Sequence, residues 1–158
     1  MRRSRAVLTT VTAAALAGCG GAHPPPEAGP DDRALVRADI TVALDALGSG
    51  HPQVVSVPRP AARPCTVVVL LATREAPRAD ATARIAAVLA GRGWRQAGAP
   101  LGDERVYTRA RWRLDVGAGT WPYARLLDLV ADEQRPEGDT FTGVIASARR
   151  EGCPAGAS

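Results

Sequence analysis

The chain contains no lysine and no asparagine, so arginine supplies all 20 of its basic residues. This bias, with abundant Ala, Gly and Pro, is what GC-rich codons produce, and we attribute the use of Arg in place of Lys to the genome rather than to function. Aromatic residues are also scarce, with one Phe and two Tyr, which excludes an aromatic stacking platform for nucleic acid. A length of 158 residues is enough for one domain and hardly for two.

The formal net charge of +4 depends on the extreme N-terminus, where Arg2, Arg3 and Arg5 lie. Removing these three from the 20 basic residues leaves 17, against 16 carboxylates. The remainder is nearly neutral, so its overall charge gives no reason to expect a nucleic-acid partner.

Residues that carry catalysis are equally few. The two histidines are His23, in a proline-rich segment, and His51, in a turn-rich loop; a zinc site would need three or four ligands. No glycine-rich stretch has phosphate-binding or dinucleotide-binding spacing. The sequence therefore predicts no cofactor, no metal and no designated catalytic residue, and it favours a protein without enzymatic activity.

Three carboxylate pairs lie at expected helix starts or loops, where acidic side chains usually cap helices or face solvent: Asp31/Asp32, Asp103/Glu104 and Asp132/Glu133. A hydrolase that acts through carboxylates or through His51 remains an alternative, although no pair is distinguished from the others.

The N-terminus has the pattern of an export signal. A basic "MRRSR" precedes an apolar run over residues 6–18, which is shorter than the roughly 20 residues that span a bilayer and fits a cleavable signal segment. The run ends in Leu-Ala-Gly-Cys at residues 16–19, which resembles the lipobox of bacterial lipoprotein precursors. In that family a diacylglyceryl group is attached to the cysteine thiol, and a peptidase then cuts before the cysteine.

The resemblance implies a signal peptide over residues 1–18 and lipidation of Cys19, with the protein held on the extracytoplasmic face of the cell membrane by its lipid. An expected helix that ends in Gly-x-Gly-Trp at residues 91–94 between two expected strands, and two further cysteines, also resemble the small lipoproteins of high-GC Gram-positive bacteria. Residues 19–32, rich in Gly and Pro, read as a flexible tether. We expect a single domain over 33–153 and a disordered tail over 154–158.

With Cys19 assigned to lipid, Cys65 and Cys153 remain. Because an exported protein meets oxidising surroundings, an even remainder of two predicts a disulfide. We expect this bond to hold a C-terminal helix against a central strand.

Hydrophobic periodicity predicts an α+β domain with two layers, an antiparallel sheet backed by helices. Helices are expected over residues 33–47, 80–90 and 139–150, and strands over 54–57, 65–73, 94–98 and 104–116. Residues 120–134 fit either a helix or the return strand of a hairpin, and the strand is favoured because a long amphipathic strand needs partners.

The expected strand 104–116 alternates along its length. One face of it would carry four arginines, which could bind an anionic polymer or lipid headgroup: Arg105, Arg109, Arg111 and Arg113. A solvated or helix-covered face is the simpler interpretation in an arginine-biased chain. Similarly, Trp94, Trp112 and Trp121 could line a cleft, but core packing is favoured.

Together these observations favour a non-enzymatic binding or interaction module of the cell envelope. Its partner would be an envelope protein or an anionic polymer, and not nucleic acid. The alternatives are the hydrolase described above and a purely structural spacer.

Overall fold

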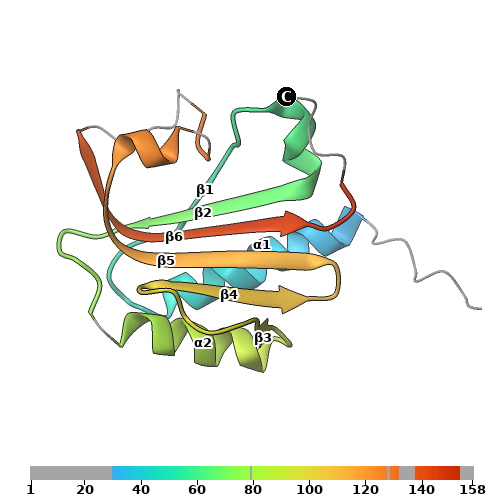
Figure 1. Ribbon diagram of the computed structural model, residues 1–158, viewed down its shortest axis with the longest axis horizontal. Coiled ribbons are helices and arrows are strands. Elements are labelled where there is room, and N and C mark those ends of the chain that lie inside the picture. Colours follow the sequence, from blue (N-terminus) through green and yellow to red (C-terminus); the bar gives the residue numbers. More distant parts are fainter. Residues whose placement is uncertain (1–29, 79, 128, 132–137, 154–158) are drawn as a thin grey trace, which may run out of the picture.

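The computed structural model describes residues 30–78, 80–127, 129–131 and 138–153. The expected signal segment, Cys19, nearly all of the tether and the C-terminal tail lie outside these ranges. Two helices cover one face of a six-stranded antiparallel sheet (Figure 1), so the predicted two-layer α+β class is confirmed. The sheet order is β1-β2-β6-β5-β4-β3. The helices are α1 (Pro30–Asp45) and α2 (Ala81–Gly91), and the strands are β1 (Gln53–Val55), β2 (Thr66–Ala72), β3 (Arg95–Gln96), β4 (Glu104–Arg109), β5 (Trp112–Pro122) and β6 (Thr140–Arg150).

The main core lies between the helices and the sheet. The apolar stripe of α1 that periodicity predicts is buried, as are Ile85 and Leu89 of α2. These side chains pack against alternate residues of β2, β5 and β6. Trp94, which follows α2, is 3% exposed and closes the end of this layer, as the sequence indicated.

The C-terminal segment is a strand, and the predicted helix over 139–150 is wrong. β6 pairs with β2 on one edge and with β5 on the other. Val144 and Ala146 face the helices, whereas Phe141 and Ile145 belong to a second cluster on the opposite face. A strand covered on both faces is apolar on both, and in this segment that pattern resembled helical spacing.

The predicted single strand over 104–116 is also wrong, because it is a hairpin. β4 and β5 are joined by a tight turn at Ala110 and Arg111, and Ala110 has a positive φ of 50°. Residue Arg109 lies opposite Trp112. A two-residue turn therefore places the odd-numbered residues of β4 on the same face as the even-numbered residues of β5.

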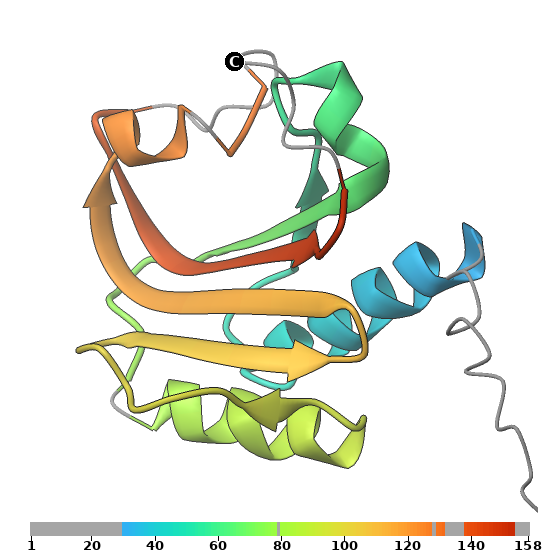
Figure 2. The same cartoon turned by 45° about the vertical axis from the view of Figure 1, so that its right-hand side comes forward.

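Within the expected segment 120–134, the described residues 120–127 and 129–131 form neither one helix nor one return strand, and residues 128 and 132–134 lie outside the described ranges. β5 continues to Pro122, and a 3₁₀ helix, η2, follows over Tyr123–Leu126. In the part of this segment that the structure describes, Leu126 and Val130 are fully buried. They cover the second face of the sheet over β1, β2 and the start of β6, where β5 and β6 curve strongly (Figure 2).

A glycine allows β6 to approach β2 closely. Gly143 has a φ of +153°, and a Cβ atom at this position would lie 1.9 Å from the carbonyl oxygen of Leu71. No residue with a side chain fits here without moving the β2 backbone.

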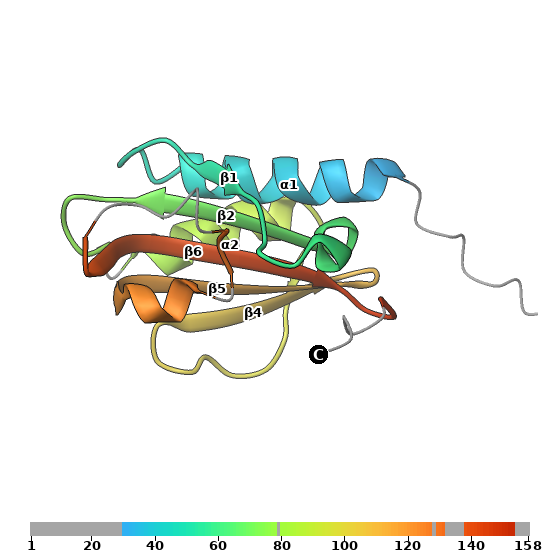
Figure 3. The same cartoon turned by 90° about the horizontal axis from the view of Figure 1, so that it is seen from above.

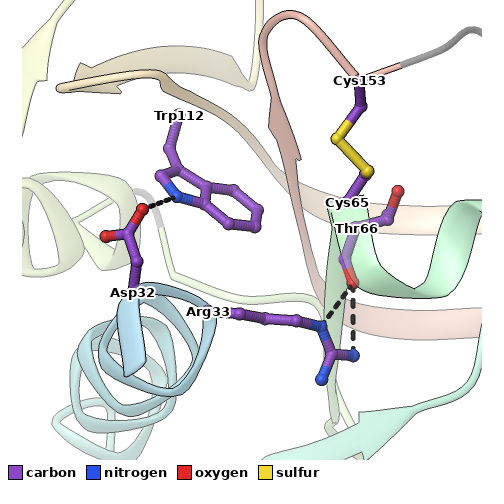
Figure 4. Close-up of a disulfide and its surroundings, with 6 residues drawn as sticks. All are labelled: Asp32, Arg33, Cys65, Thr66, Trp112 and Cys153. Atoms are coloured by element: carbon purple, nitrogen blue, oxygen red, sulfur yellow. Dashed lines mark hydrogen bonds between the residues drawn. A yellow bond between two sulfur atoms is a disulfide. The ribbon is translucent and has the colours of Figure 1, made fainter. Parts of the chain in front are cut away.

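The predicted disulfide is confirmed between Cys65 and Cys153, whose Cα atoms are 6.1 Å apart (Figure 4). Cys65 ends the 3₁₀ helix η1 (Pro60–Cys65), directly before β2. Because the last element is a strand, the bond ties the end of β6 to the start of β2 rather than holding a helix on the sheet.

Candidate functional site

The sheet face opposite the helices is only partly covered. The second cluster occupies the area over β1 and β2. Over β4, β5 and β6 the surface forms an open cavity of about 330 Å³, bordered by Ala99 and Leu101 of the loop before β4 and by Arg125 and Leu129 in and after η2. This volume lies at the lower end of the range of small-molecule sites.

Two arginines face each other across the strands in this cavity. Arg113 of β5 lies directly opposite Arg149 of β6 in the sheet register, and both side chains are exposed. Opposed residues in antiparallel strands have Cβ atoms about 5 Å apart, and like charges at that spacing destabilise the sheet. Such a pair opposes folding, so its presence suggests a role other than stability.

Neutralisation of this pair is incomplete. The Arg113 Nη2 atom lies 3.3 Å from Oδ1 of Asp115, and both side chains are 53% exposed. Arg149 makes no ion pair with any residue that the structure describes. Ser147 lies opposite Asp115 and adds a hydroxyl to the same wall. The wall therefore presents two guanidinium groups against one carboxylate, with a hydroxyl beside them. It keeps a net positive charge, and its guanidinium groups can donate to a planar anion.

The other half of the cavity is apolar. Trp121, Leu129 and Ile145 line it, and the Trp121 ring stacks on Phe141 with centroids 6.0 Å apart. The indole of Trp121 folds back over its own strand and lies against Gly117 and Gly119. A Cβ atom added at either glycine would lie only 3.3 or 3.5 Å from the ring. These two glycines make room for a flat apolar wall beside the charged one.

Residues from η2, from β4 and from the loop before β4 form the rim of the cavity. Arg125 of η2 forms an ion pair with Glu104 of β4, which connects the two sides of the opening. Leu101, in the loop before β4, also lines the cavity and is 76% exposed. An exposed leucine at the mouth of a cavity adds apolar contact area for a ligand.

The hairpin divides the four arginines that were expected to share one face. Arg105 and Arg109 lie opposite Val116 and Trp112, on the helix side, and Arg109 binds Asp39 of α1. Arg111 is at the exposed turn, and Arg113 alone points to the open face. That four-residue face does not exist as predicted, although Arg105 still reaches the edge of the cavity through Gly102 and Glu104, whose carbonyl oxygens accept its hydrogen bonds.

The other candidate residues lie elsewhere or are already engaged. His51 is exposed in the turn before β1 and does not line the cavity. Asp32 accepts a hydrogen bond from Trp112 Nε1 at 2.7 Å, so its predicted role as a helix cap is replaced by a contact with the sheet. Glu104 is paired with Arg125, and the Asp132/Glu133 pair lies outside the described residues. Trp94 and Trp112 are buried, as core packing predicted, whereas Trp121 lines the cavity.

Within the described ranges, no three His, Cys, Asp or Glu side chains gather as metal ligands would. Among the same residues, no helix has the length and hydropathy needed to cross a bilayer.

Arg149 and Ser147 are not expected in a site from the sequence, because the spacing over residues 139–150 predicts a helix. Reading the segment as a strand would have placed Ile145, Ser147 and Arg149 on one face. The alternation was present, but the apolar residues on both faces obscured it.

The chain matches no protein-family model, no curated protein and no solved structure. A functional proposal therefore depends on the residues and the geometry of the site.

Proposed function

We propose that this chain is a lipid-anchored binding module on the extracytoplasmic face of the cell membrane, and that its cavity takes an anionic ligand without turning it over. The lipobox-like residues 16–19 and the Gly/Pro-rich tether support the location. In the sequence of the domain that follows, we recognise no set of residues with the spacing of a known catalytic site.

The opposed pair of Arg113 and Arg149 carries the proposal. Two cations at adjacent positions raise the free energy of the empty protein, and an anion placed between them relieves that repulsion. A carboxylate, sulfonate or phosphate group accepts hydrogen bonds from both guanidinium groups, whereas a neutral ligand cannot offset their charge. Binding therefore depends on the charge of the ligand.

The apolar wall sets the second requirement. A ring or short hydrocarbon chain next to the anionic group would displace water from Trp121, Leu129 and Ile145 and add the hydrophobic contribution of the buried area, about 25 cal/mol per Å². The site thus favours an anion that carries an apolar part over a small hydrophilic ion such as phosphate.

Native mass spectrometry of the protein, extracted gently from its own membrane, is the first test. Acyl mass on a chain that begins at Cys19 would support the anchor. Additional mass that leaves on denaturation would identify the ligand. An unacylated chain would contradict the proposed location.

Binding of 8-anilinonaphthalene-1-sulfonate, an aromatic anion, tests the site directly. We expect one saturable site in the wild-type chain and about tenfold weaker binding after Arg113→Gln, from loss of a charge-assisted contact worth roughly 1.5 kcal/mol. The matched control is Arg95→Gln, an exposed arginine of β3 that does not line the cavity. Equal affinity in the two variants would contradict the proposal.

The hydrolase alternative makes a different prediction about His51. If a turnover is found against a cell-envelope substrate and His51→Ala abolishes it, the protein is an enzyme, and the non-enzymatic proposal is wrong.

A further inference from the structure

The cavity over β4, β5 and β6 has an excess of positive charge. Among the described residues that line it, four are arginines and two are carboxylates. Two other described carboxylates, Asp103 and Glu151, lie within two residues of these groups in the sequence. Neither lines the cavity, and neither forms an ion pair within the described part of the chain. Two positive charges therefore remain, and a ligand with a single anionic group can neutralise only one of them.

One of these charges lies at the end of the cavity where β5 begins. Arg113 is paired with Asp115, whose Oδ1 atom lies 3.3 Å from the arginine Nη2. Arg149 lies opposite Arg113 in the sheet register and forms no ion pair with a described residue. This first end thus contains one arginine–carboxylate pair and one arginine whose charge is not neutralised.

The other charge lies at the rim, where β4 begins. Arg125 of η2 is paired with Glu104. Arg105 donates hydrogen bonds to the carbonyl oxygens of Gly102 and Glu104, at 2.6 and 3.0 Å, and neutral carbonyl groups leave its charge in place. It forms no ion pair with any residue that the structure describes. The second end therefore has the same composition as the first.

The sheet register sets the distance between the two ends. Glu104 lies opposite Gly117 of β5, and Gly117 comes four residues after Arg113 in the same strand. At a rise of about 3.4 Å per residue, four residues span about 14 Å. The short orange helix in Figure 3 is η2, which lies on the side of the sheet away from α1 and brings Arg125 to Glu104. A ligand must therefore be long to reach both ends.

The surface between and beside the two ends is mainly apolar. Gly117 has no side chain, and the Trp121 ring lies against it, because an added Cβ atom would be 3.3 Å from the ring. Among the described residues that line the cavity, the Ser147 hydroxyl is the one polar side-chain group that belongs to neither end. The aliphatic side chains of the lining are Val106, Val116, Leu129 and Ile145, with Leu101 at the mouth. An apolar middle part of a ligand would gain from burial here.

We infer that the ligand is a dianion, with one acidic group near each end of an apolar part about 14 Å long. This inference rests on the proposed anion site and specifies its ligand. One acidic group binds between Arg113 and Arg149, and the other binds Arg105 beside the pair of Arg125 and Glu104. Charge-assisted hydrogen bonds from guanidinium groups suit carboxylate, sulfonate and phosphate groups alike. A dianion neutralises both ends, whereas a monoanion leaves one end uncompensated.

Straight-chain dicarboxylates are suitable probes of this length. Because C–C bonds are about 1.5 Å long and successive bonds zigzag, a chain of about twelve carbon atoms spans the required distance. Isothermal titration calorimetry compares dodecanedioate with dodecanoate, which has the same length and one acidic group, and with the shorter hexanedioate. The titrations use the full chain in phosphatidylcholine nanodiscs, and the heat from empty nanodiscs is subtracted.

The expected order of affinity differs from that of a purely apolar pocket. Such a pocket prefers dodecanoate, because a methyl group is buried more readily than a carboxylate. We expect dodecanedioate to bind at least about fivefold more tightly than dodecanoate, because its second carboxylate gains charge-assisted hydrogen bonds. One molecule should bind per chain. Hexanedioate should bind more weakly than dodecanedioate, because it cannot reach both ends.

Two variants of the second end test the position of the second acidic group. Arg105→Gln and Arg125→Gln each remove one positive charge there, so each should lower the preference for dodecanedioate over dodecanoate toward one. Using both variants keeps the test valid if one of them perturbs the loop before β4. The matched control is Arg95→Gln, in which the exposed arginine of β3 does not line the cavity, and it should keep the full preference.

The outcomes separate this inference from the proposed function. Dodecanoate that binds as tightly as dodecanedioate would overturn the dianion and leave the anion site intact. A preference that survives both Arg105→Gln and Arg125→Gln would also overturn it, because the second acidic group would then bind elsewhere. If neither these acids nor 8-anilinonaphthalene-1-sulfonate binds, the proposed function is wrong, and this inference with it.

Discussion

The carboxylate of Asp39, in α1, accepts a hydrogen bond from the indole Nε1 of Trp94 at 3.1 Å. The two residues are 55 positions apart and are 5% and 3% exposed. Arg92, after α2, lies 2.9 Å from the same carboxylate, and Arg109 of β4 binds it as well. One buried acid thus joins both helices to the hairpin strand, on the side of the sheet away from the cavity.

Replacing this acid should destabilise the fold. Asp39→Ala leaves the Trp94 N–H without its acceptor and two arginines without their counter-charge. Because the arginines are about one-third exposed, water recovers part of the loss, and we expect the free energy of unfolding to fall by about 2–4 kcal/mol in urea titrations. The control Asp45→Ala, at the exposed end of α1, should stay within about 0.5 kcal/mol. Equal midpoints for the two variants would contradict the role of Asp39.

The disulfide should contribute substantially to stability. It closes a sequence separation of 88 residues, and removing this link increases the entropy of the unfolded chain. Reduction, or replacement of Cys65 and Cys153 by Ser, should lower the free energy of unfolding by about 3–5 kcal/mol. Unfolding is followed by circular dichroism with and without reductant. The doubly substituted variant should not respond to reductant; a response would mean that reduction acts elsewhere.

Gly143 should not tolerate a side chain. Gly143→Ala places a Cβ atom 1.9 Å from the Leu71 carbonyl oxygen, so β2 and β6 must separate, and we expect a loss of at least about 3 kcal/mol or failure to fold. Gly91→Ala, at the end of α2, meets nothing within 4 Å and should be neutral or slightly stabilising. The comparison is made by thermal unfolding, and similar melting temperatures for the two variants would refute the close approach.

Tyr107 should give the fold a pH dependence in alkali. Burial raises the pKa of its phenol above the ordinary value of 10.0, and Arg105 offsets part of the rise. Above pH 10 the unfolded chain loses this proton while the folded chain keeps it, so stability is fully present below pH 10 and falls as the pH rises toward the folded pKa. Burial also raises the pKa of Tyr123, which adds a contribution of the same sign.

The test is urea unfolding of Tyr107→Phe between pH 8 and 11. The variant should lose less stability than the wild type above pH 10. At pH 8 it should be unchanged or up to about 1 kcal/mol more stable, because the Tyr107 hydroxyl is buried without a partner among the described residues. A parallel alkaline decline in both proteins would assign the effect to other groups.

Reversing one charge of the cavity should separate stability from binding. Arg149→Glu places a carboxylate directly opposite Arg113 and replaces repulsion by attraction, so the free energy of unfolding should rise by about 0.5–1 kcal/mol. The same change should abolish binding of the aromatic sulfonate. A variant that is both more stable and still able to bind would show that the arginine pair is not the anion site.

The sequence by itself determined the local elements whose pattern arises within one segment. The stripe of α1 at Val36, Ile40 and Leu44 requires only that one side of a helix be buried, and the β-branched run of β2 requires only cover on both faces. Neither the helix nor the strand depends on which other segment of the chain packs against it. The pairing of Cys65 with Cys153 was predicted by elimination, on the proposal that the third cysteine, Cys19, carries lipid, and the structure has this bond.

Tertiary structure alone decided which side chains meet. The alternation over 104–116 continues through the turn at Ala110, and the reversal there moves Arg105 and Arg109 away from Arg113. The β6 segment is a strand because β2 and β5 supply hydrogen bonds on both of its edges, and those partners are distant in sequence. The cavity, with Arg149 opposite Arg113, exists only after these strands pair. The sequence shows which residue types each segment carries, but it does not show which residue of β5 lies opposite which residue of β6.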